Sequence, residues 1–237
     1  MSTMKWILGS IASSLLFASS ALAQTDTQQA LTCAIPSTQP TQLEKLVEPR
    51  SAEESARLQH APHATKRLAK HELQIGWSSG HRLFKDKPPF LEGSLDGLVW
   101  IYCGYSPALE LHLIGKNDEQ GFTGTLVDDA KGSLLPGGES VLFSPNRKLY
   151  IAYSQPDGQD GETLSLYTRS GSLLWQGYNG FLSPDGTILG NFENLHWDLE
   201  NKLIAEITPN SQKKSTVALT HRNGKWKWVP ITNLKLP

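Results

Sequence analysis

Two short motifs recur along the chain at the same offset, and this repeat constrains the fold more than any other feature of the sequence. The run Gly132-Ser-Leu-Leu135 returns as Gly171-Ser-Leu-Leu174, and Phe143-Ser-Pro145 returns as Leu182-Ser-Pro184, both 39 residues later. Two separate motifs that share one offset indicate a repeated structural unit. A period near 40 residues is typical of repeats in which each unit forms one small sheet.

Fainter copies extend the repeat in both directions. Gly93-Ser-Leu95 and Tyr105-Ser-Pro107 precede the clear copies, and Leu219-Thr-His-Arg-Asn-Gly224 is a degenerate candidate for a fourth copy. An apolar residue stands five positions after the serine of each Ser-Pro pair, as Leu111, Leu149 and Ile188. We therefore expect these three residues to occupy equivalent places.

From Leu73 onward, the sequence pattern is that of an all-β protein. Short β-prone runs alternate with Gly, Pro, Asn and Asp, for example at 98–102, 149–153 and 226–229. Runs of this length at turn-bounded intervals predict an antiparallel all-β domain. We assign this domain to residues 71–237.

The repeated hairpins resemble a known superfamily. Phe143-Ser-Pro-Asn-Arg-Lys-Leu-Tyr150 and Leu182-Ser-Pro-Asp-Gly-Thr-Ile188 resemble the F-S-P-D-G-K hairpins of WD-repeat-like and related bacterial propellers. Leu166-Tyr-Thr-Arg-Ser-Gly-Ser-Leu-Leu-Trp175 is similar to the strand-turn-strand of quinoprotein-type blades. The resemblance implies a β-propeller-like fold with antiparallel repeats of about 39 residues.

The repeats are too few for the large rings of that superfamily. Either residues 71–92 complete a small four-bladed ring, or the repeats form an incomplete propeller, an open β-meander or a sandwich. A quinone cofactor site of the quinoprotein kind is therefore not implied, and we expect no cofactor.

The N-terminus has the three-part pattern of a secretory signal peptide over residues 1–23. Lys5 precedes a short apolar stretch, and Ala21-Leu-Ala23 supplies small residues for cleavage before Gln24. No later segment has the run of apolar residues that a membrane-spanning helix needs. We expect an exported protein, periplasmic or secreted, that does not span the membrane.

Cys33 and Cys103 are the two cysteines of the chain. In an oxidising compartment their pairing is forced if an intramolecular bond forms, so we predict that they are joined. The bond would tie an N-terminal arm, residues 24–70, to the first repeat. Within this arm, Ser51 and Glu54 have capping-box spacing and predict a short helix starting there. Pro62 ends it, and a further turn or two is expected from His63 to about Lys70.

Candidate chemistry is sparse. The Ser-Pro-Asn and Ser-Pro-Asp elements read as turns, and their serines are not catalytic candidates. His60, His63 and His71 lack a third ligand at fixed spacing and are expected to be solvated histidines on a polar helix. Asp157, Asp160 and Glu162 form a weak candidate for a calcium loop, although they lack the full ligand spacing and no metal site is expected.

Aromatic residues are the most suggestive candidates for a binding surface. Trp226 and Trp228 alternate with Lys225 and Lys227, so on a strand both indoles face one side. This pattern fits core packing of a terminal strand. The alternative is an aromatic binding face, together with Trp197 and Tyr178, for sugars or a protein.

The sequence contains no nucleophile elbow, phosphate-binding glycine loop or metalloprotease motif, which favours a binding protein over an enzyme. A formal net charge of −1 indicates no nucleic-acid partner. We expect an interaction module that binds another exported or cell-envelope protein, as an inhibitor or immunity-type factor. The alternative is a carbohydrate- or cell-wall-directed enzyme or glycan-binding protein.

Overall fold

The computed structural model describes residues 29–33, 47–87, 97–118, 121–155, 162–182, 188–208 and 214–231. In this part of the chain it contains helix α1 (Val47–Gln59) and strands β1 to β17, whose pairings are all antiparallel. This confirms the predicted all-β class. The proposed signal peptide, residues 1–23, lies outside the described residues.

The strands form four sheets in chain order. The first sheet contains β2 (Lys66–Ala69), β3 (Glu72–Trp77) and β4 (Gly80–Lys85). The second contains β5 (Leu98–Ser106), β6 (Leu111–Asp118), β7 (Gly121–Asp128) and β8 (Leu134–Pro136). The third contains β9 (Ser140–Phe143), β10 (Leu149–Ser154), β11 (Thr163–Thr168) and β12 (Leu173–Tyr178), and the fourth contains β13 (Gly180–Leu182), β14 (Ile188–Trp197), β15 (Leu203–Ile207), β16 (Ser215–Arg222) and β17 (Lys225–Pro230).

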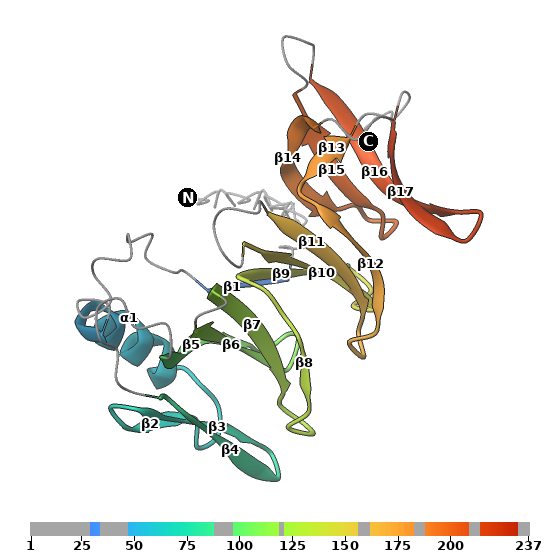
Figure 1. Ribbon diagram of the computed structural model, residues 1–237. Coiled ribbons are helices and arrows are strands. Elements are labelled where there is room, and N and C mark those ends of the chain that lie inside the picture. Colours follow the sequence, from blue (N-terminus) through green and yellow to red (C-terminus); the bar gives the residue numbers. More distant parts are fainter. Residues whose placement is uncertain are drawn as a thin grey trace, which may run out of the picture.

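The sheets lie face to face, each packed on the sheets before and after it (Figure 1). Side chains of one strand alternate between faces, so a middle sheet can contribute to two cores. Leu113 packs towards the third sheet and its neighbour Ile114 towards the first. Likewise, in the third sheet Tyr150 packs in the core shared with the second sheet, and Ile151 packs in the core shared with the fourth. We call the three layers of packing the first, middle and last seams.

The repeat read from the sequence marks equivalent positions in these sheets. Leu111, Leu149 and Ile188 are the first residues of β6, β10 and β14, the second strands of their sheets. Gly132 and Gly171 lie in the turns β7–β8 and β11–β12, with φ angles of 65° and 88°. The prediction of equivalent tight turns is confirmed.

The equivalence extends to what these turns contact. A Cβ on Gly132 would lie 2.4 Å from the Trp77 indole of the first sheet, and one on Gly171 would lie 2.9 Å from Cδ of Pro136 in the second. Each glycine turn therefore packs closely against the preceding sheet. The absence of a side chain allows both the positive φ and this close approach.

The Ser-Pro element acts as a turn, as expected. The Ser144 hydroxyl accepts a bond from the N–H of Leu149 (3.1 Å), and the Asn146 side chain accepts one from the N–H of Lys148 (3.0 Å). Ser144 is buried and holds the β9–β10 connection closed. The matching residues 183–187 lie outside the described part of the chain, as does the faint copy that starts at Gly93.

Three local predictions need correction. Helix α1 begins at Val47 and not at Ser51, so Ser51 is inside the helix and not at its start. Residues 66–69 form strand β2 and not a helical turn, because they pair with β3 in the first sheet. Finally, the candidate fourth copy ending at Gly224 turns from β16 to β17, the last two strands of its sheet, whereas the Ser-Pro copies join the first two strands of theirs.

The disulfide is present as predicted: Cys33 and Cys103 are bonded, with Cα atoms 4.7 Å apart. Cys33 directly follows β1 (Ala30–Thr32), which pairs with β9 and adds a strand to the third sheet. Cys103 lies in β5 of the second sheet. The N-terminal segment therefore extends one sheet by strand addition and is covalently attached to its neighbour.

Candidate functional site

The predicted aromatic residues do not form one exposed face. Trp197 is buried, and its Nε1 donates to the carbonyl of Leu142 across the last seam (3.0 Å). Trp226 and Trp228 are half-buried against the same core, and the Trp228 ring lies 4.2 Å from that of Phe192. Tyr178 is 57% exposed on β12. The structure thus separates Tyr178 from the three tryptophans, which occupy packing positions.

The predicted acidic group is described only at Glu162. Its carboxylate accepts a hydrogen bond from the side chain of Asn179, and it raises the pKa of nearby Tyr153 after the larger effect of burial. Asp157 and Asp160 lie outside the described residues. In the described ranges, no group of three His, Cys, Asp or Glu side chains is arranged to hold a metal ion.

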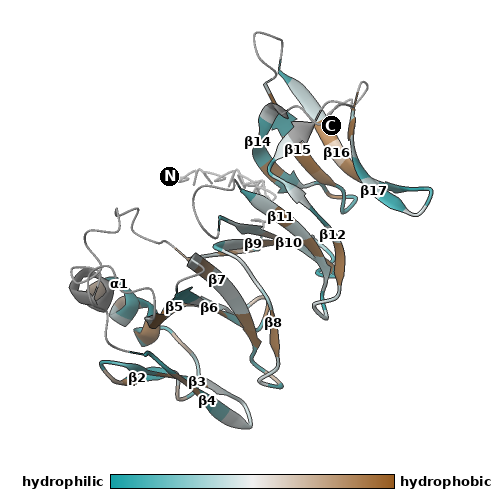
Figure 2. Ribbon diagram, viewed as in Figure 1, coloured by the Kyte–Doolittle hydropathy of each residue, from teal (hydrophilic) through white to brown (hydrophobic). Residues whose placement is uncertain are grey.

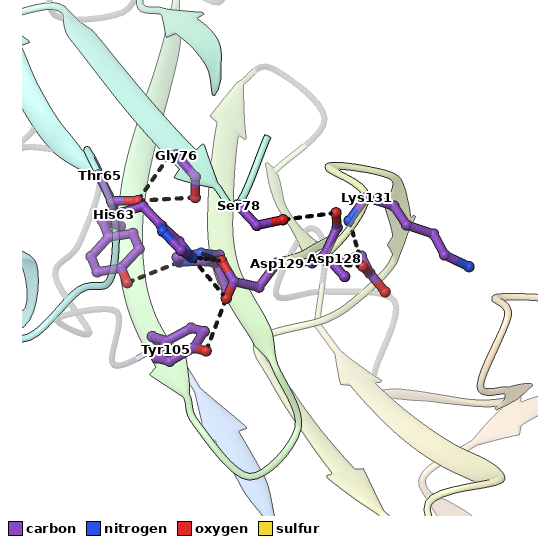
Figure 3. Close-up of polar contacts among 11 residues, drawn as sticks. His63, Thr65, Gly76, Ser78, Tyr105, Asp128, Asp129 and Lys131 are labelled. Atoms are coloured by element: carbon purple, nitrogen blue, oxygen red, sulfur yellow. Dashed lines mark hydrogen bonds and ion pairs between the residues drawn. The ribbon is translucent and has the colours of Figure 1, made fainter. Parts of the chain in front are cut away.

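A polar cluster that the sequence does not reveal lies in the first seam, around Asp129 (Figure 3). The Asp129 carboxylate contacts Nε2 of His63 (3.2 Å), Nε2 of His112 (3.3 Å) and the hydroxyl of Tyr105 (3.1 Å). Nδ1 of His112 lies 3.2 Å from the hydroxyl of Tyr102. His63 precedes the first sheet, while the other four residues belong to the second sheet or its turn.

The geometry assigns the protons of this cluster. If Asp129 is a carboxylate, both histidines donate from Nε2, and Nδ1 of His112 accepts from Tyr102. Burial lowers the pKa of His112, although Asp129 partly opposes this effect, so the imidazole is neutral at pH 7. Burial and the bond to Asp129 raise the pKa of Tyr105 to about 12, which keeps it a donor.

The cluster ties together two sheets and a turn. The backbone N–H of Ser78, just after β3, donates to the carbonyl of Asp129 (3.1 Å), and the N–H of Asp129 donates to that of Glu110 (3.0 Å). His63 has a positive φ of 55° and a side chain that is 37% exposed. A half-exposed imidazole held by a carboxylate is the arrangement of many general bases. No serine, threonine or cysteine side chain contacts its ring among the bonds of the described residues.

A second polar network joins α1 to the same seam. Arg67 binds both carboxylate oxygens of Glu54 (2.7 and 2.8 Å) and the carbonyl of Trp100 (2.7 Å). Glu54 also accepts from the N–H of Tyr102 (2.7 Å), and Asp86 accepts from that of Trp100 (2.7 Å). Buried charges with this many partners fix the position of the helix on β5.

Position along the sequence gives no sign of either network. His63 and Asp129 are 66 residues apart and have no motif spacing, so only the stacking of the first two sheets brings them together. The expectation that His63 and His71 lie on a helix is wrong, because both are turn residues. Their side chains are partly exposed, as expected, yet His63 contacts Asp129 and His71 contacts Asp86 (3.3 Å). His60 is exposed in the turn after α1.

Large apolar side chains are exposed on the outer edges of the sheets. Strands β4, β8 and β12 are the last strands of the first three sheets and lie along one side of the stack (Figure 1). Figure 2 shows the hydrophobic colour of β8 and β12 on that side. The exposed side chains and their exposed fractions are Leu83 (42%), Leu134 (44%), Leu173 (54%), Leu174 (38%) and Tyr178 (57%). We call these five residues the edge row.

β12 differs from the other outer edges in its lack of protection. Edge strands commonly carry charges or proline that prevent pairing with another chain. β4 contains Arg82 and Lys85, β8 has three residues and ends at Pro136, and β17 contains Lys225 and Lys227. β12 has the sequence Leu-Leu-Trp-Gln-Gly-Tyr, with neither charge nor proline.

Comparisons with known proteins find no counterpart for this chain. No family model, no curated protein and no solved structure matches it. Within the described residues, no helix is long and apolar enough to cross a membrane. The disulfide fits a protein outside the cytoplasm, where such bonds persist.

Proposed function

We propose that this protein is an exported interaction module whose outer sheet edges bind another exported polypeptide. The edge row carries the proposal, because three of its five side chains belong to β12, an outer edge strand with neither charge nor proline. Clustered exposed apolar side chains typically mark protein contact sites. The signal-peptide pattern and the disulfide support export.

The scaffold that we propose for this function is propeller-like. The second sheet is built from four consecutive strands in up-and-down order, and so is the third apart from the added β1; the sheets stack in chain order. Such an arrangement presents the last strand of each sheet at the outside. The edge row would then follow from the repeated architecture, because each sheet presents its last strand on the same side.

The test is capture of partners from a cell-envelope extract by the tagged mature protein. The variant Leu173→Ser/Leu174→Ser/Tyr178→Ser should lose a partner that the parent retains, because these side chains supply the contact area. The matched control Leu68→Ser/Leu199→Ser changes exposed apolar residues that lie outside the edge row and should retain it. Circular dichroism must show that all variants are folded.

The glycan-directed alternative has less support, since three of its four aromatic residues pack in the last seam. A glycan array and a hydrolysis assay would detect it. Turnover that one carboxylate substitution abolishes in a folded variant would replace our proposal with an enzyme.

A further inference from the structure

The backbone of β12 has hydrogen-bonding groups available on its outer side. The N–H of Asn179 donates to the carbonyl of Glu162 (2.8 Å), so this pair is hydrogen-bonded towards β11. Inward and outward bonding alternates along an antiparallel strand. Gly177, opposite Leu164, therefore bonds inward, while the N–H and C=O of Gln176 and Tyr178 point away from β11.

Strand addition already occurs at the opposite edge of this sheet. β1 pairs with β9 in register from Ala30 to Thr32, so the β9 edge is covered by a segment from the N-terminal part of the chain. The β12 edge has no strand partner within the described residues. The third sheet is thus extended on one side and open on the other.

We propose that the polypeptide bound at β12 is a second copy of this chain, paired antiparallel about a two-fold axis. The inference rests on the proposed function and names the partner of that same site. Charge favours this occupant, because a strand without charged residues meets no like charge in its own copy. The Lys and Arg residues of β4 and β17 would repel each other in the same arrangement.

The outward N–H and C=O groups of β12 can also pair with the same groups of a second copy. An axis at Gly177 places Tyr178 opposite Gln176 of the second copy, which permits about four backbone hydrogen bonds. A Cβ on Gly177 would lie 2.5 Å from the Trp175 indole, so that ring covers the glycine. The two Trp175 rings would therefore meet near the axis and add apolar contact to the backbone bonds.

The experiment is sedimentation of the purified, disulfide-bonded mature protein over a concentration series. We expect the parent to have twice the mass of one chain at about 100 μM, a concentration that detects even a weak dimer. Gln176→Pro removes an outward N–H without breaking a bond to β11, and Leu173→Lys adds a charge to the edge. Each should weaken dimerisation by about tenfold or more, while Leu68→Lys on β2, outside the edge row, should not.

Each outcome has a distinct meaning. A dimer that persists in folded Gln176→Pro and Leu173→Lys overturns pairing through β12. A parent that stays monomeric overturns the second copy as partner, yet the proposed function stands if β12 variants lose a different captured protein. A monomer that captures nothing through β12 overturns both proposals. Thermal melting checks that Gln176→Pro is folded, and Leu173→Lys provides an independent test if it is not.

Discussion

The first and last seams each join two sheets, but they do so with different kinds of side chains. The first seam buries two polar networks, around Glu54 and Asp129, beside its apolar core. The last seam is dominated by Trp197, Phe192 and half-buried tryptophans, and its polar contacts include the bond from the Trp197 indole to a backbone carbonyl. Both join sheets of similar build, so the repeat specifies stacking but not the side chains that achieve it.

This difference has consequences for stability and specificity. An apolar seam stabilises the fold through the area it buries, and it tolerates repacking. In a buried charged network, removal of one partner leaves the other charge uncompensated and lowers the stability of the fold strongly. The first seam should therefore be sensitive to single substitutions and to pH, and the last seam to loss of ring volume or of the Trp197 indole bond.

The largest expected effect is at Glu54. Its replacement by Ala leaves Arg67 without its main buried partner and the N–H of Tyr102 without an acceptor. We expect a loss of about 3 to 5 kcal/mol in the free energy of unfolding, measured by urea denaturation. Glu53→Ala is the matched control, because Glu53 is exposed and pairs with Arg57 at 3.4 Å on the helix surface. Equal effects of both changes would refute the distinction between the seams.

The glycine turns test whether equivalent positions behave alike in successive seams. Val at Gly132 or Gly171 must adopt a positive φ, which should cost about 1 to 3 kcal/mol of folding free energy at each site. Gly132→Val should cost more, because its Cβ would also approach the Trp77 ring more closely than that of Gly171 approaches Pro136. Gly224→Val, where a Cβ meets no atom within 4 Å, separates backbone strain from the clash. A variant as stable as the parent would contradict the shared turn.

The indole bond of the last seam can be removed while most of the ring volume is kept. Trp197→Phe leaves the carbonyl of Leu142 without this donor and should lower the free energy of unfolding by about 1 to 3 kcal/mol. Trp226→Phe, at a half-buried ring of the same seam, should cost less. Thermal denaturation of both variants gives the comparison, and the reverse order would show that ring area outweighs the bond.

The smallest expected effect is a pH dependence specific to the first seam. Burial lowers the pKa of His112 in the folded state, so the unfolded chain binds a proton at higher pH than the native one. Stability should therefore fall as the pH drops below about 6.5, by at most about 1.4 kcal/mol per pH unit for one proton. His63, Asp129, Tyr102 and Tyr105 are the titratable groups around this ring.

The control for this effect is His112→Gln, which cannot gain the proton. Urea denaturation at pH 7.5 and pH 5.5 should show a smaller difference between the two pH values for this variant than for the parent. An unchanged difference would assign the pH dependence to groups elsewhere in the molecule.

Much of the fold could be predicted because its signals are local. Turn chemistry at Gly132, Gly171 and Ser144 depends on a few neighbouring residues, and alternation of apolar residues predicts strands without knowledge of their partners. The same local reasoning was wrong at residues 66–69, because pairing with β3 outweighed the expectation of a helical turn there.

The sequence alone determined the all-β class, the repeat positions and the cysteine pair, because periodicity, turn residues and a count of two cysteines require no knowledge of distant contacts. Only the tertiary structure decided that Trp197 is buried while Tyr178 is exposed, and that His63 and His112 both contact Asp129. These outcomes depend on which face of each sheet is covered by the next one. Face-to-face stacking joins residues that are far apart in the chain, and no local pattern encodes that contact.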